Sequence, residues 1–115
     1  MKIQVTPEAK NDLVEIRKYI TNDLQNPSAA LNVIKKITKR IRKLSGFPLM
    51  GTALSSIVDI ETDYRLLVCG SYSAFYRFDD EYVYIIRVLD SRRDFMRILF
   101  GIILVDDDFD LNDSD

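Results

Sequence analysis

The spacing of apolar residues predicts two helices in the first half of the chain. Residues 2–5 alternate between polar and apolar, which fits a short edge strand, and apolar residues then recur every three or four positions through 7–23 and 28–44. Thr6 and Pro7 suit a helix start, because a threonine side chain can cap a helix and proline fits its first position. The sequence therefore predicts a helical hairpin.

In the second half of the chain the apolar period changes to two, with many β-branched and aromatic residues. Gly70 and Ser71 suit a tight hairpin turn, and Asp79 and Asp80 suit the next one. The expected strands are residues 57–60, 64–69, 72–78 and 82–89. We therefore expect an α+β fold: an N-terminal strand, a helical hairpin, and an antiparallel three- to four-stranded meander packed on the helices.

Composition places the chain among ordinary globular proteins. It has 115 residues, of which 47% are hydrophobic and 30% charged, and this suits a single domain. The longest apolar run, 98–105, is eight residues long, whereas a membrane span needs about 20. The N-terminus turns polar at once and lacks a signal-peptide core. We expect a cytoplasmic protein without membrane contact.

Several kinds of catalytic and metal site are excluded by residue usage. Cys69 is the single cysteine and there is no histidine, so an internal disulfide, a Ser–His–Asp triad and most zinc sites are ruled out. Cys69 lies in an apolar run, where we expect a small buried side chain rather than a nucleophile. We expect neither a metal site nor a cofactor.

The net charge of −2 conceals two oppositely charged parts. The chain carries 16 basic and 18 acidic residues, and six of the acids lie in 106–115, where there is no base. We therefore expect a modestly basic domain at 1–100 and an extension at 101–115 that is apolar, then acidic, and partly disordered. The apolar part could also add an edge strand or pair with another chain, and the acidic part could fold over the basic domain.

A basic cluster lies in the second predicted helix, where six of the nine residues in 35–43 are Lys or Arg. Three- and four-residue spacing puts four of these side chains on one face: Lys36, Lys39, Arg40 and Lys43. They form either a solvated helix face or a phosphate-binding patch.

A second basic group follows the predicted meander. Arg65, Arg77 and Arg87 lie on three successive strands, and Arg92, Arg93 and Arg97 follow the last strand. An arginine within an apolar strand is costly to bury without a partner. These side chains must face solvent, pair with acids such as Asp59, Glu61 and Asp63, or line a concave site for an anion, where the planar guanidinium binds two oxygens.

These runs together resemble the RelE/ParE toxin superfamily. The resemblance rests on residues 63–68, 72–78 and 83–95, and on the helical hairpin with its opening at 6–9. It covers residues 2 to about 100, and relatives commonly end near Phe100. The resemblance implies the RelE/ParE-like fold described above.

The resemblance also implies a toxin that inhibits growth when free of a cognate antitoxin, in a type II toxin–antitoxin system of the kind that stabilises plasmids. RelE-like members cut messenger RNA on the ribosome, and ParE-like members poison DNA gyrase. The alternative is an inactive relative that only binds the antitoxin and regulates the operon. A homodimer or a heterotetramer with the antitoxin is compatible with either.

Residue roles carry over position by position. The candidate catalytic residues are Arg65, Arg92 and Arg93, and the candidate target- or antitoxin-binding residues are Arg77, Arg87, Phe95 and Arg97. Ser73 stands where RelE enzymes carry another arginine, Asp90 where relatives often have histidine or tyrosine, and Phe95 where tyrosine is frequent. Because phenylalanine has no proton to transfer, these departures favour a ParE-like activity over a nuclease.

Overall fold

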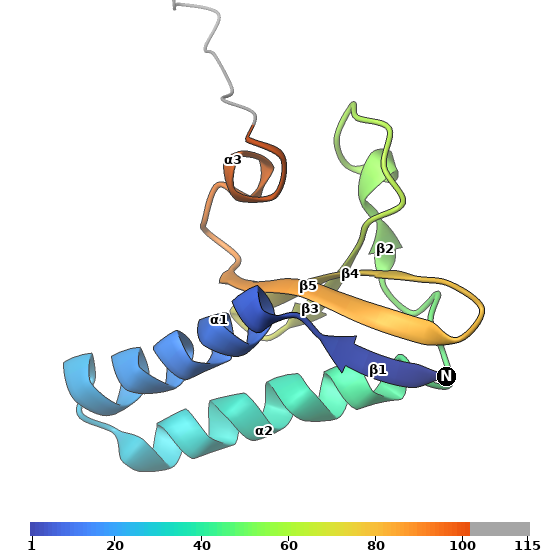
Figure 1. Cartoon of the computed structure of the whole chain (residues 1–115). Coiled ribbons are helices and arrows are strands. Elements are labelled where there is room, and N and C mark those ends of the chain that lie inside the picture. Colours follow the sequence, from blue (N-terminus) through green and yellow to red (C-terminus); the bar gives the residue numbers. More distant parts are fainter. Residues whose placement is uncertain (102–115) are drawn as a thin grey trace, which may run out of the picture.

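The computed structural model describes residues 1–101, which form one sheet with a helical hairpin against one face and a short helix on the other (Figure 1). The elements are β1 (Lys2–Val5), α1 (Pro7–Lys18), the π-helical turn η1 (Tyr19–Asp23), α2 (Pro27–Lys43), β2 (Thr52–Ala53), the 3-10 turn η2 (Leu54–Ser56), β3 (Arg65–Cys69), β4 (Tyr72–Phe78), β5 (Tyr82–Asp90) and α3 (Phe95–Phe100).

The sheet is mixed, with strand order β1-β5-β4-β3-β2. The β3, β4 and β5 strands form the antiparallel meander that the sequence predicts, and β2 adds to it antiparallel to β3. The N-terminal strand joins the other edge parallel to β5, with Lys2 opposite Tyr82. The predicted α+β architecture is confirmed.

Both predicted helices form, and side chains cap their first turns. The Thr6 hydroxyl accepts a hydrogen bond from the Ala9 N–H at 3.1 Å and donates one to the Ile86 carbonyl at 2.9 Å, which ties the start of α1 to β5. Asn26 caps α2 through the Ala29 N–H. The predicted 7–23 helix is α-helical to Lys18 and then widens into the π-helical turn.

The predicted strand at 57–60 is wrong, and α3 was not predicted. The N–H groups of Ile57 and Val58 both bond to the Leu54 carbonyl, so this segment is a turn whose backbone groups are used locally. The short strand β2 lies five residues earlier, at Thr52–Ala53, and pairs with Leu66 and Arg65 of β3. A β-branched run at 57–60 therefore reflects packing of Val58, not strand pairing.

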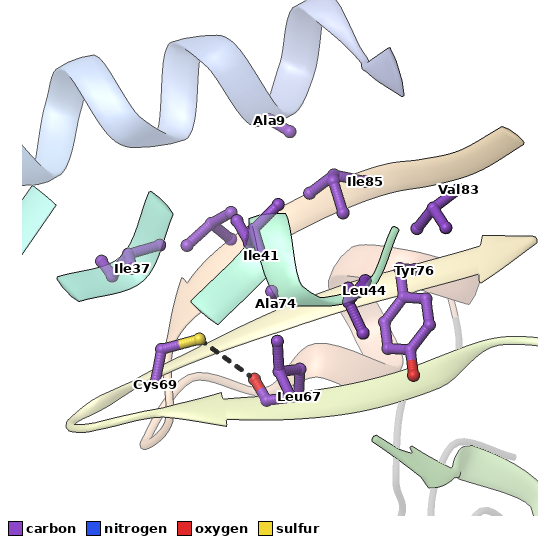
Figure 2. Packing of buried hydrophobic residues seen from close by; sticks show 11 residues of the cluster. Ala9, Ile37, Ile41, Leu44, Leu67, Cys69, Ala74, Tyr76, Val83 and Ile85 are labelled. Carbon is purple, nitrogen blue, oxygen red and sulfur yellow. Dashed lines mark hydrogen bonds between the residues drawn. The ribbon is translucent and has the colours of Figure 1, made fainter. Parts of the chain in front are cut away.

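The larger core lies between the hairpin and the sheet (Figure 2). Its buried members come from α1, α2 and all three meander strands: Ala9, Ile37, Ile41, Leu44, Leu67, Cys69, Ala74, Tyr76, Val83, Ile85 and Val88. Cys69 is 6% exposed, and burial raises the pKa of its thiol, so it is the packing residue that the sequence predicts.

A smaller cluster covers the opposite face of the sheet under α3. Leu54, Phe75 and Leu89 are buried there. Around them pack half-buried side chains from the preceding loop, β3 and α3: Val58, Tyr64, Leu66, Phe95, Ile98, Leu99 and Phe100. Phe75 and Tyr76 are adjacent in β4 yet belong to different clusters, because successive strand residues point to opposite faces.

Gly101 ends α3 in the left-handed conformation, with φ 67°. The rest of the expected extension, with its apolar run to residue 105 and the acidic residues after it, lies outside the described residues. No helix in residues 1–101 is long and apolar enough to cross a membrane.

Candidate functional site

A hollow of about 370 Å³ lies on the sheet face opposite the hairpin, between the β3–β4 turn and the segment that leads into α3. We call it the open-face hollow. Its lining is mostly apolar, with a polar rim: Leu66, Val68, Gly70, Ser73, Phe75, Asp90, Ser91, Arg93 and Phe95. Of the six arginines in the predicted sheet group, Arg93 is the one that lines it.

Arg93 is exposed and its guanidinium forms no ion pair or side-chain hydrogen bond within residues 1–101. It also lines a second hollow of about 320 Å³ between α1 and the end of β5, where Tyr19, Tyr72 and Arg92 lie. Arg93 therefore stands at the boundary of two concave surfaces, available to an anionic partner.

The neighbouring Arg92 is paired within its own turn. Its Nε and Nη2 donate to the two carboxylate oxygens of Asp90 at 3.1 and 3.0 Å, and its backbone N–H donates to the same carboxylate at 2.9 Å. These bonds hold the pKa of Asp90 below its usual range. Arg92 thus orders the turn after β5, although its side chain is 88% exposed.

Arg87 pairs with a residue that sequence inspection missed. Its guanidinium donates two hydrogen bonds to Asp12 of α1 at 2.7 and 2.8 Å, and the same carboxylate accepts from the Val88 N–H at 2.9 Å. Asp12 is 8% exposed. The pair fastens α1 to β5, and the candidate binding role of Arg87 is not supported by its position. Asp12 lies on the apolar face of α1, and a carboxylate in such a position was the sequence signal from which a buried ion pair could have been predicted.

Arg77 lies at the exposed end of the sheet. Its Nε donates to Asp63 at 2.9 Å, and its guanidinium carbon stands 5.7 Å from the centre of the Tyr84 ring. The hydrogen bond that Arg77 donates to Asp63, together with the charge of that carboxylate, raises the pKa of Arg77. The predicted pairing with Asp63 is thus present, and it leaves Arg77 away from the open-face hollow.

Arg65 stabilises the loop between α2 and β2. Its Nη2 donates to the carbonyls of Leu49 and Gly51 at 3.2 and 2.6 Å, while its Nε is buried without a hydrogen-bond partner in residues 1–101. Tyr76 fixes the same loop, since its hydroxyl donates to the Pro48 carbonyl at 2.7 Å and accepts from the Gly51 N–H at 3.0 Å. Arg65 therefore binds the backbone carbonyls of this loop.

The loop between α2 and β2 needs a glycine at position 51, because the backbone there lies very close to its neighbours. A Cβ atom built on it would lie 2.6 Å from the Leu66 carbonyl oxygen and 2.7 Å from the Tyr76 hydroxyl. The loop can reach Arg65 and Tyr76 only because this position lacks a side chain.

The remaining candidates around α3 are one packed aromatic residue and one exposed arginine. Phe95 packs on Phe75 with ring centres 5.3 Å apart and also forms one wall of the hollow. Arg97 is exposed on α3. Ser73, at the position where an arginine would stand in RelE enzymes, shares a 2.9 Å hydrogen bond with Ser91, which sequence inspection did not single out.

The basic face of α2 is partly structural. Lys36, Lys39 and Lys43 are exposed, whereas Arg40 donates through Nε and Nη2 to the Val68 carbonyl at 3.3 and 3.0 Å. That carbonyl lies on the edge of β3 beyond the two residues that pair with β2. Arg40 therefore covers an open sheet edge, and only the three lysines remain for the predicted phosphate patch.

No group of three metal-ligating side chains is close enough to hold an ion in residues 1–101.

Several solved structures share this fold. A chain of the chromosomal ParDE TA system from P. aeruginosa is 24% identical, with 78% of this chain and 95% of that chain covered and a TM-score of 0.66. The YoeB/ParE toxin from Agrobacterium tumefaciens is 18% identical, covering 78% and 98%, with a TM-score of 0.52. YafQ from E. coli strain BL21(DE3) is 15% identical, covering 87% and 98%, with a TM-score of 0.50. At these identities the likeness concerns the fold.

The fold thus defines a small α+β protein with one face of its sheet covered by a helical hairpin. The family model described as the ParE toxin of the type II toxin-antitoxin system, parDE, matches residues 3–95, so the chain belongs to this family. It is the toxin of a type II toxin–antitoxin system. None of the curated proteins matches the chain significantly.

Proposed function

We propose that this toxin poisons DNA gyrase, is silenced by a cognate antitoxin, and does not cut messenger RNA. The observation that carries the proposal is that two of the three candidate catalytic arginines already bond to other groups of the protein. Arg65 is committed to loop carbonyls and Arg92 to Asp90, which leaves Arg93 alone beside the hollow. Residues 1–100 would form the toxic domain, acting in the cytoplasm.

The hollow is poorly equipped for cleavage of RNA. Attack by a ribose 2′-hydroxyl needs a base with a pKa near the working pH and several cations around the phosphate. Asp90 is the one carboxylate that lines the hollow, and its pKa is lowered by Arg92, which makes it a weak base at neutral pH. Besides Asp90 and Arg93, the hydrogen-bonding side chains that line it are Ser73 and Ser91, which bond to each other.

Surface character supports a protein target and a protein inhibitor. Phe47 and Leu49 are 70% and 67% exposed in the loop between α2 and β2, where they border an almost entirely apolar hollow of about 540 Å³. Exposed apolar surface of this kind is typical of protein–protein contacts. We assign it to the antitoxin, whose binding would also cover Arg93.

The decisive experiment compares two purified reactions. In a supercoiling assay with DNA gyrase, the toxin is expected to block supercoiling, and Arg93→Ala should weaken the block about tenfold or more, as loss of a charged contact does. Arg17→Ala, the same change at an exposed position on α1, is the matched control. Ribosome-dependent cleavage of messenger RNA is expected to be absent.

Unchanged supercoiling at excess toxin would overturn the gyrase proposal. Cleavage of ribosome-bound messenger RNA that is lost in Arg93→Ala would favour the nuclease instead. Expression without the adjacent gene adds the cellular control: growth arrest with DNA-damage signalling is expected, while normal growth would favour the inactive, antitoxin-binding relative.

A further inference from the structure

The end of α3 brings the chain back to the beginning of β3. The Phe100 ring packs on Tyr64, with ring centres 5.4 Å apart, and Tyr64 directly precedes β3. Gly101 then closes the helix through a 2.8 Å hydrogen bond from its N–H to the Arg97 carbonyl, in a left-handed conformation that changes the direction of the chain. The described part of the chain therefore ends next to a helix turn that packs beside the first residues of β3.

The open-face hollow continues along the same strand. Leu66, Val68 and Gly70 line it, at successive positions on the face where Tyr64 lies. An extended chain covers about 3.3 Å per residue, the same rise as a strand, so the four residues 102–105 reach about as far as Val68. Three further residues would span the distance to the β3–β4 turn, where the Ser91 N–H bonds to the Ser71 carbonyl and Arg93 lines the hollow two residues later.

The segment and the hollow match in character along their length: each is apolar first and charged afterwards. Residues 102–105 are Ile-Ile-Leu-Val and residues 106–108 are three aspartates. The near part of the hollow presents Leu66 and Val68, and the Val68 residue is 55% exposed, which is unusual for a valine on a sheet face. The far part presents Arg93, which has no carboxylate partner in residues 1–101.

We infer that residues 102–108 of this chain dock in the open-face hollow, with the apolar run on Leu66 and Val68 and the aspartates at Arg93. A tethered segment of this length has an effective concentration in the millimolar range, so weak contacts suffice for occupancy. The toxin thus carries its own competitor for the surface that meets an anionic partner. Competition with gyrase rests on the proposed function, whereas the docking itself does not.

The docking is tested by paramagnetic relaxation in the full chain. A nitroxide on Val105→Cys is expected to broaden the amide signals of Val68, Gly70, Ser73 and Arg93 and to spare α2. Cys69 is buried and should stay unlabelled, which a mass measurement of one label per chain verifies. Broadening confined to α3, or spread equally over α2 and β3, would overturn the proposal.

Two controls test which residues dock and whether they belong to the same molecule as the hollow. A nitroxide on Asp115→Cys should broaden the hollow less than the label at 105, and equal broadening contradicts docking by residues 102–108. In a mixture of spin-labelled unenriched chains with unlabelled ¹⁵N chains, the hollow signals should stay sharp. Broadening in that mixture would assign the hollow to the segment of a second copy instead.

Charge is tested with matched double variants of the spin-labelled chain. Asp107→Asn with Asp108→Asn should reduce the broadening at Arg93, while Asp113→Asn with Asp115→Asn should leave it, although both pairs change the net charge equally. Equal loss from both pairs would contradict a local contact with Arg93. In the gyrase assay, the first pair should inhibit more strongly than the unaltered toxin. If no chain inhibits gyrase, the proposed function fails while the docking result stands.

Discussion

The two faces of the sheet are built differently, and the difference separates stability from function. On the hairpin face, α1 and α2 bury a continuous core that draws on every strand of the meander (Figure 2). On the other face, the cover that residues 1–101 provide is the six-residue α3 and the loop before β3, and a hollow remains beside Arg93. The buried core on the hairpin face can stabilise the fold, so the other face of the sheet is free to bind different partners.

The largest expected effect compares isoleucines on the two faces. Ile37 of α2 is 1% exposed, and Ile37→Ala should lower the free energy of unfolding by about 3 kcal/mol through lost burial and a cavity. Ile98 on α3 is half-buried, so Ile98→Ala should cost about 1 kcal/mol. Urea unfolding measures both. Equal losses would mean that the two faces contribute alike.

The second prediction concerns the ion pair that fastens α1 to β5. Asp12→Asn should lower the free energy of unfolding by about 3 kcal/mol, because Arg87 and the Val88 N–H lose a carboxylate partner in a largely buried place. Asp63→Asn removes the exposed Arg77 pair and should cost less than about 1 kcal/mol. A deficit for Asp12→Asn as small as that of Asp63→Asn would show that α1 is held by its apolar face alone.

The third prediction tests the loop between α2 and β2. Tyr76→Phe removes one donor and one acceptor from Pro48 and Gly51 and should cost about 1–2 kcal/mol in unfolding free energy. Hydrogen exchange at the Gly51 amide should accelerate by more than the global loss explains. Tyr82→Phe is the control, since the Tyr82 hydroxyl makes no hydrogen bond within residues 1–101. Unchanged exchange at Gly51 would contradict the role of the hydroxyl.

The smallest effect belongs to the open face and depends on pH. The folded-state pKa of Asp90 is lowered, so its contribution to stability is present above the unfolded pKa of about 3.9 and is lost as the pH falls through the lower folded value. Asp90→Asn should therefore be less stable than the unaltered chain at pH 7, by under about 1 kcal/mol, and should match it near pH 2. A deficit that persists in acid would point to packing instead of the Arg92 bond.

Local patterns were sufficient for most of the fold. The three- and four-residue apolar spacing of the helices, the cap at Thr6 and the turn at Gly70 are properties of neighbouring residues, and the structure confirms them. The error at 57–60 has a physical cause. A short β-branched run has the same composition whether it pairs in a sheet or packs one side chain from a turn, and only the partner strand decides.

The candidate site was harder to predict from sequence, because the carboxylate nearest to an arginine along the chain is not necessarily the one that pairs with it in the fold. Asp63 does pair with Arg77, 14 positions away, but Asp12 and Arg87 are 75 positions apart, and Arg65 found carbonyls instead of acids. Six arginines looked equivalent in the sequence. The sheet register and the position of α1 determine which of them are neutralised.

The sequence alone therefore determined the α+β class, the helical hairpin, the meander and the family resemblance that the family match confirmed. These depend on periodicity and on short-range capping and turn chemistry, which a chain carries in its local order. The tertiary structure alone decided that Arg65, Arg87 and Arg92 bond to other groups of the protein, whereas Arg93 has no such partner within residues 1–101 and lines a hollow. A charge becomes available for binding only when folding brings no opposite charge to it, and that outcome depends on contacts between distant parts of the chain.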